Sequence, residues 1–184
     1  MTKIILGIGI PGSGKTTFLK NFAQKYKYEY IAADDIRSEL GISHSDPLAF
    51  GNNPTTRQIW DEIRDRMKES LKQSKTVVLD ATFVSPNLRR NFIKLARENG
   101  AEKVQGVFLD TPSEIAWERT QKRSSDRQSP GHTFEERVRL LKENPPDIQD
   151  GFDTVFTIQE YENILKSETL NRERKMEYKP PSKL

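Results

Sequence analysis

The sequence contains no cysteine and only two histidines, His44 and His132. Without thiols, disulfide scaffolds, cysteine-ligated zinc clusters and thiol nucleophiles are all excluded. Neither histidine has partners at metal-ligand spacing, so we expect both to lie on the surface or in loops. A chain without cysteine suits a reducing compartment, and we expect a cytoplasmic location.

Long hydrophobic runs and an excess of one charge sign are missing too. No apolar run approaches the ~20 residues that span a bilayer, so no membrane partner is predicted. The chain has 30 Lys+Arg and 27 Asp+Glu, which leaves a net charge of +3. This balance is compatible with a polyanionic partner without requiring one. A length of 184 residues suits one compact domain with a hydrophobic core.

Short apolar runs alternate with helical patterns along the chain. Residues 3–10 are apolar without polar alternation, which is typical of a strand buried on both faces of a parallel sheet. Further strands are predicted at 28–32, 76–82, 103–110 and 153–158. Helices are predicted at 15–26, 34–40, 55–74, 86–98, 113–122 and 133–142, with Thr55, Thr111 and Thr133 as capping residues. The pattern predicts an α/β, three-layer fold with a parallel sheet of about five strands.

A glycine-rich loop follows the first predicted strand. Gly9-x-x-x-x-Gly14-Lys15-Thr16 matches the phosphate-loop pattern of nucleotide-binding proteins. We expect residues 12–17 to hold the phosphates of ATP, because glycines let backbone N–H groups converge on phosphate oxygens. Lys15 is expected to reach the β- and γ-phosphates and Thr16 to ligate Mg²⁺. ATP and Mg²⁺ are therefore the expected cofactors. The sequence lacks the Asn-Lys-x-Asp guanine signature of GTPase switches, which argues against that class.

Carboxylates follow the second and third predicted strands, whose C-terminal ends face the ligand crevice in such sheets. In "AADDIR", either Asp34 or Asp35 is placed to take a proton from an attacking hydroxyl, and Arg37 to grip an anionic group on the acceptor. Asp80 ends "VVLD" and suits either a magnesium-site or an acceptor-pocket role. Phe83 follows Asp80, and two roles are open for it. It either stacks on a nucleic-acid base or packs as a hydrophobic staple before the next helix.

Basic residues cluster in "WERTQKRSSDR", which we expect to form an arginine-containing lid. Arg119 and Arg123 are four residues apart and share one helix face. Guanidinium groups on a lid can neutralise charge on a transferring phosphoryl group and exclude water. Arg123 and Arg127 are the alternatives for the arginine that acts there.

Together, "KIILGIGIPGSGKTTFLKNF", "YIAADDIR", "VVLDATFVSPNLRRNF" and "ERTQKRSSDR" resemble the 5′-kinase domain of phage-type polynucleotide kinases over most of residues 3–145. The resemblance implies Lys15 and Thr16 at the ATP phosphates and Mg²⁺, and Asp34, the first of the pair, as general base. It implies Arg37 at the acceptor phosphate. The resemblance also implies Asp80 as a supporting acidic residue. It implies Arg123 as the lid arginine, with Arg119 close by.

The family pattern and this sequence differ on the acceptor side. Members that act on nucleic acid often have Asn-Arg before the base, where this chain has Ala32-Ala33, and Asn after the third strand, where it has Phe83. The leading expectation is an ATP-dependent kinase of the 5′-hydroxyl of DNA or RNA. The alternatives are a kinase of a sugar, nucleoside or antibiotic hydroxyl, and a non-enzymatic nucleotide switch. We expect residues 1–158 to form the kinase domain and 159–184 a charged C-terminal tail.

Overall fold

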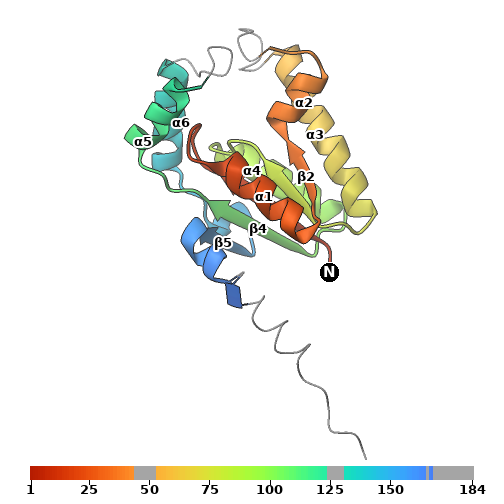
Figure 1. The fold of residues 1–184 in the computed structure, drawn as a ribbon. Helices are drawn as coiled ribbons and strands as arrows, with labels where there is room; N and C mark the ends of the chain where they lie inside the picture. The colour runs from red at the N-terminus through yellow and green to blue at the C-terminus, as the bar shows by residue number, and fades with distance from the viewer. Residues whose placement is uncertain (44–52, 124–130, 165, 168–184) are drawn as a thin grey trace, which may run out of the picture.

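The computed structural model describes residues 1–43, 53–123, 131–164 and 166–167. Its centre is a five-stranded sheet in the order β2-β3-β1-β4-β5 (Figure 1), and all four neighbouring pairs are parallel. The strands are β1 (Lys3–Ile8), β2 (Glu29–Ala32), β3 (Val77–Asp80), β4 (Lys103–Phe108) and β5 (Thr154–Thr157). The predicted α/β class and the parallel sheet of about five strands are confirmed.

Six α-helices are described between these strands. They are α1 (Lys15–Tyr26), α2 (Ala33–Glu39), α3 (Pro54–Lys72), α4 (Pro86–Glu98), α5 (Ser113–Gln121) and α6 (Gly131–Glu143). A short 3₁₀ helix, η3 (Ile148–Asp150), precedes β5. No described helix is both long and apolar enough to cross a bilayer.

The central strand β1 is buried on both faces. Ile4, Leu6 and Ile8 belong to the cluster that includes residues of α3 and α4, whereas Ile5 belongs to the cluster with Leu19 of α1. Successive side chains of a strand point to opposite faces, so this division shows that helices cover both sides of the sheet. The three-layer arrangement predicted from the uninterrupted apolar run is confirmed.

Three predicted helix caps are wrong. The cap of α3 is Asn53, whose Oδ1 accepts a hydrogen bond from the Thr56 N–H at 2.9 Å, because Pro54 takes the first helical position ahead of Thr55. Helix α5 begins without a side-chain cap, since the Thr111 hydroxyl donates to another loop. Helix α6 begins at Gly131, so Thr133 lies inside its first turn.

The segment after β5 packs onto the domain. Residues 158–164 are helical, and Tyr161 is buried against the rings of Phe18, Phe22 and Phe156 at centroid distances of 6.4, 5.4 and 5.5 Å. The first part of the expected tail therefore covers α1. The expected boundary at residue 158 stays a prediction, and residues 168–184 lie outside the described part of the chain.

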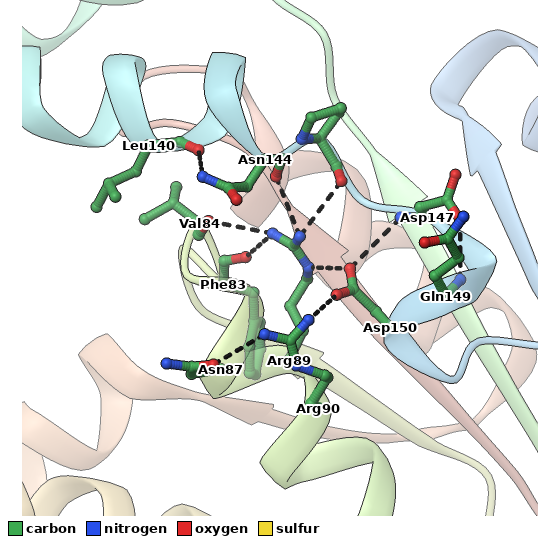
Figure 2. Close-up of polar contacts among 11 residues, drawn as sticks. Phe83, Val84, Asn87, Arg89, Arg90, Leu140, Asn144, Asp147, Gln149 and Asp150 are labelled. Carbon is green, nitrogen blue, oxygen red and sulfur yellow. Dashed lines mark hydrogen bonds and ion pairs between the residues drawn. The ribbon is translucent and has the colours of Figure 1, made fainter.

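A buried arginine ties together the turn after β3, the end of α6 and η3 (Figure 2). Arg89 is 1% exposed, and its Nε donates to Oδ2 of Asp150 at 2.6 Å. Its two terminal nitrogens donate to backbone carbonyls at 3.0–3.3 Å, those of Phe83, Val84, Asn144 and Pro145. An arginine has five N–H donors, so every donor of this buried cation has an acceptor.

We predict that Arg89→Met lowers the free energy of unfolding by about 3–5 kcal/mol, because removing one partner leaves the buried Asp150 carboxylate and four carbonyls short of a donor. The matched control is Arg90→Met. Arg90 is half exposed and reaches the same carboxylate at 3.4 Å, so its loss is expected to be below about 1 kcal/mol. Urea denaturation measures both, and equal losses would contradict the assigned role of Arg89.

Candidate functional site

The loop between β1 and α1 lies directly against helix α5. Gly12 and Gly14 have φ angles of +81° and +93°, a conformation that other residues rarely adopt. A Cβ atom on Gly12 would lie 2.1 Å from the backbone oxygen of Ala116 in α5. Glycine at this position is therefore required both by the turn and by the close approach of the helix.

The carbonyl groups of this loop are engaged with other parts of the protein. Their donors are Lys15 Nζ to Ile10 O (3.0 Å), Thr111 Oγ1 to Ser13 O (3.0 Å) and Arg119 Nη1 to Gly12 O (3.4 Å). The first N–H groups of α1 have no partner within the helix, as at any helix N-terminus. The loop thus keeps its acceptors turned to the protein, and the start of α1 offers donors and a positive dipole end to an anion.

Lys15 carries its ammonium group in a buried position. The side chain is 7% exposed, and burial lowers the pKa of Lys15 to about 8. The carboxylates of Asp80 and Asp34 oppose this shift, and the guanidinium groups of Arg123 and Arg137 add to it. These charges come from β3, α2, the residues just after α5, and α6, so four separate parts of the chain act on this lysine.

Oxygen ligands suited to Mg²⁺ lie beside the loop. Thr16 and Thr17 are exposed in the first turn of α1. Asp80 is paired with Gly7 across the sheet and is buried, and its Oδ2 accepts a hydrogen bond from the Tyr30 hydroxyl at 2.7 Å. Burial, followed by the Asp80 carboxylate, raises the pKa of Tyr30. A hydroxyl, a carboxylate and phosphate oxygens form the kind of set that Mg²⁺ takes in phosphoryl-transfer sites, so these residues fit the ion.

Asp34 and Arg37 form an ion pair on α2. Arg37 Nη1 lies 2.7 Å from Asp34 Oδ1, and the side chains are 9% and 54% exposed respectively. The buried guanidinium therefore holds a carboxylate that remains open to an incoming group. Asp35, the other candidate base, is exposed in the first turn of the same helix.

Arg119 and Arg123 border a cavity of about 730 Å³ at the loop. The loop contributes Gly12, Ser13 and Gly14, and α1 contributes Thr17 and Phe18. The rest of the wall comes from residues 21, 22, 25 and 26 of α1 and from residues 109, 158 and 162. The structure thus gathers the predicted loop and arginine residues around one cavity, whereas Arg127 and His44 lie outside the described residues.

Phe83 is a correction to the predicted site. Its side chain is 0% exposed, and its ring lies 6.0 Å from that of Trp60 and 5.3 Å from that of Phe92. A ring buried in an aromatic cluster has no face left for a bound base. The prediction of Phe83 as an acceptor contact is therefore wrong, and this residue belongs to the core.

Two residues near the site were missed by the sequence reasoning. Tyr30 holds Asp80 through the hydrogen bond described above. Arg137 lies on α6, where burial and then the neighbouring Arg37 lower its pKa, while Asp34 opposes the shift. The sequence offered one signal for Arg137, its spacing. It lies three residues after Phe134 and four before Leu141, so it shares a helix face with two buried apolar residues.

Comparison with known proteins matches one family model and finds relatives that are named as kinases. The model of the AAA domain family matches residues 4–144. A protein of Acanthamoeba polyphaga mimivirus, named as a bifunctional polynucleotide phosphatase/kinase, is 26% identical over 114 residues, which are 62% of this chain and 22% of that protein. Adenylate kinase isoenzyme 1 of Homo sapiens is 34% identical over 86 residues, 43% of this chain and 44% of that enzyme. The chain thus matches less than half the length of either relative.

A solved structure shares the fold. A chain from the structure of the Pnkp1/Rnl/Hen1 RNA repair complex superposes with a TM-score of 0.66 and 22% identity, covering 82% of this chain and 46% of that one. At this identity the likeness establishes the fold alone.

We predict that Lys15→Met raises the stability of the protein near neutral pH. The unfolded chain keeps the lysine proton up to its ordinary pKa of 10.5, whereas the folded protein releases it near pH 8. The unfolded state therefore binds more protons between pH 8 and 10.5, and the free energy of unfolding rises with pH in that window. Below pH 8 the penalty is fully present and amounts to about 3 kcal/mol.

Urea denaturation of both proteins at pH 7 and pH 10 measures this effect. The methionine variant is expected to be the more stable protein at pH 7, with an advantage reduced by the lost hydrogen bond to the Ile10 carbonyl. The advantage should shrink towards pH 10. A variant that is less stable at pH 7, or a difference that does not change with pH, would contradict the burial penalty.

Proposed function

This chain belongs to the AAA domain family and is a P-loop kinase, and from that premise we propose that it transfers the γ-phosphate of ATP to the 5′-hydroxyl of a DNA or RNA strand. The single observation that carries the proposal is the Asp34–Arg37 ion pair. Its exposed carboxylate also raises the pKa of Lys15, the lysine of the phosphate loop. A nucleotide switch needs no such carboxylate. The viral polynucleotide phosphatase/kinase among the relatives supports the polynucleotide acceptor.

The donor side uses the loop and the adjoining cavity. Residues 12–17 and Lys15 hold the triphosphate, and the base enters the cavity bordered by Phe18, Arg119 and Arg123. Bound Mg²⁺ would be held by Thr16, with Asp80 nearby, and would supply charge neutralisation at the phosphates. Arg123 and Lys15 stabilise the charge on the transferring phosphoryl group.

The acceptor side uses Asp34. Its carboxylate accepts the proton of the 5′-hydroxyl as the oxygen forms its bond to the γ-phosphorus, and the bond from that phosphorus to the β-γ bridging oxygen of the leaving ADP breaks. A carboxylate of ordinary pKa suffices for this step, because orienting the hydroxyl contributes most of the effect. Arg37 keeps the carboxylate oriented and contacts the acceptor phosphate. Asp35 contacts the acceptor beside it.

A kinase of small-molecule hydroxyl groups is the second candidate. Ala32 and Ala33 precede the base where nucleic-acid kinases often have a polar pair, and Ala32 is buried. The human adenylate kinase among the relatives is named for a small acceptor. On this alternative the donor side keeps the same residues, and only the acceptor differs.

Phosphate transfer from γ-labelled ATP to a 5′-hydroxyl oligonucleotide is the direct test. We predict that Asp34→Ala lowers kcat by about 10²–10⁴-fold, the usual contribution of a positioned base, while the Kd for ATP changes little. Transfer to a panel of small alcohols but not to oligonucleotides would select the second candidate instead.

Asp61→Ala is the matched control. Asp61 forms an ion pair with Arg64, also three residues along a helix, at 2.6 Å, and it is 67% exposed on α3 away from the loop. We expect this variant to keep full activity. If ATP binding collapses in Asp34→Ala as much as transfer does, the aspartate has a structural role and the proposed mechanism fails.

A further inference from the structure

Asp80 lies on the face of the sheet that α1 covers. Its register partners are Gly7 in β1 and Ala32 in β2, so it stands between the strand that leads to the phosphate loop and the strand that leads to Asp34. Side chains of register partners point to the same face of a sheet. A Cβ atom on Gly7 would lie 2.1 Å from Cδ1 of Leu19, so α1 packs directly over this end of the sheet. A carboxylate that is 6% exposed therefore lies beside the helix that begins the nucleotide site.

The first turn of α1 is turned to the same end of the sheet. Lys15 lies four residues before Leu19 and both are buried, so their side chains share the face of α1 that packs on the strands. Thr16 follows and is exposed. The start of α1 thus brings Thr16, the proposed Mg²⁺ ligand, to the end of the sheet at which β3 ends with Asp80.

Tyr30 holds one oxygen of the Asp80 carboxylate. It lies in β2 two residues before Ala32, so its side chain points to the same face as that of Asp80. The Tyr30 hydroxyl donates to Oδ2 of Asp80 at 2.7 Å, a hydrogen bond that the negative charge of the acceptor strengthens. Among the residues that the structure describes, Oδ1 accepts no hydrogen bond. The two oxygens of this carboxylate therefore have different environments.

The direction of a carboxylate has to be set by its partners. The terminal torsion of an aspartate is broad, so the side chain alone does not fix where each oxygen points. Groups that bond the acidic residues of a metal site orient them, and their loss typically lowers metal affinity or activity 10- to 100-fold. A phenylalanine in place of Tyr30 would keep the ring and would leave Oδ2 without this donor.

We propose that Tyr30 is a positioning residue for Mg²⁺: its hydroxyl holds Oδ2 of Asp80, so that Oδ1 is directed to the ion bound with the triphosphate. This inference rests on the donor side of the proposed function and does not depend on which hydroxyl accepts the phosphate. Tyr30 acts through Asp80 and contacts neither the ion nor the nucleotide. Because the tyrosine is neutral, its loss changes the direction of the carboxylate and leaves the charge of the site unchanged.

Calorimetric titration with ATP, in the presence and in the absence of Mg²⁺, tests this inference on wild type, Tyr30→Phe and the control Tyr28→Phe. We expect Tyr30→Phe to lower the ratio of the two ATP affinities about 10-fold, the lower end of the usual effect of losing such a partner. The affinity for ATP without Mg²⁺ should stay unchanged. Tyr28 packs on the same cluster two residues earlier, so its variant removes a phenol hydroxyl that does not bond Asp80, and it should match wild type.

The Asp80→Asn background separates the positioning role from a structural one. If Tyr30 acts through Asp80, Tyr30→Phe adds no further loss of Mg²⁺ dependence in the double variant. Additive losses, or an equal weakening of ATP binding with and without Mg²⁺, would overturn the inference. A wild-type affinity for ATP that does not respond to Mg²⁺ would overturn it as well.

ATP binding needs no acceptor, so this test and that of the proposed function can fail separately. If oligonucleotides are not phosphorylated but the affinity ratio falls in Tyr30→Phe, the proposed function fails and the positioning role stands. If oligonucleotides are phosphorylated and the ratio is the same in wild type and Tyr30→Phe, the positioning role fails and the function stands.

Discussion

The constraint on which the rest of this structure depends is a positive charge buried at the end of the central strand. Lys15 opens α1, is 7% exposed, and donates to the Ile10 carbonyl of its own loop. Burial opposes the charged form and lowers its pKa to about 8, although Asp80 and Asp34 favour it. An ammonium group in this position suits a polyanion, since a bound triphosphate would add negative charge to that of Asp80 and Asp34.

The surrounding fold holds this loop rigidly. Helix α5 packs so closely on Gly12 that no side chain fits there, and Thr111 and Arg119 hold the loop carbonyls from the side of α5. The core on both faces of β1 fixes the strand that leads into the loop. Binding energy is therefore not spent on ordering the loop, which is the advantage of a preorganised site.

Three arginines lie in two different environments. Arg89 has a carboxylate and four carbonyls as acceptors for its five donors, so it joins the turn after β3 to the end of α6 as a structural element. Arg37 instead pairs with the exposed Asp34, and the pKa of Arg137 is lowered by burial and then by Arg37, while Asp34 and Glu136 oppose this shift. The first arrangement stabilises the fold, and the second leaves the Asp34 carboxylate exposed beside a buried guanidinium.

The sequence by itself determined the fold class, the five parallel strands, the phosphate loop and the adjacency of Asp34 and Arg37, because periodicity and motif spacing act over a few residues. Only the tertiary structure decided that Phe83 enters the core, that Asn53 caps α3, that Tyr30 donates to Asp80, and that Arg37 acts on the pKa of Arg137. These features depend on which elements pack together. Phe83 lies beside Trp60, a residue of a helix that precedes it in the chain, and the pKa of Arg137 is lowered by Arg37, one hundred positions earlier. Local spacing carries no information about contacts between residues that distant, since the packing of the whole core selects them.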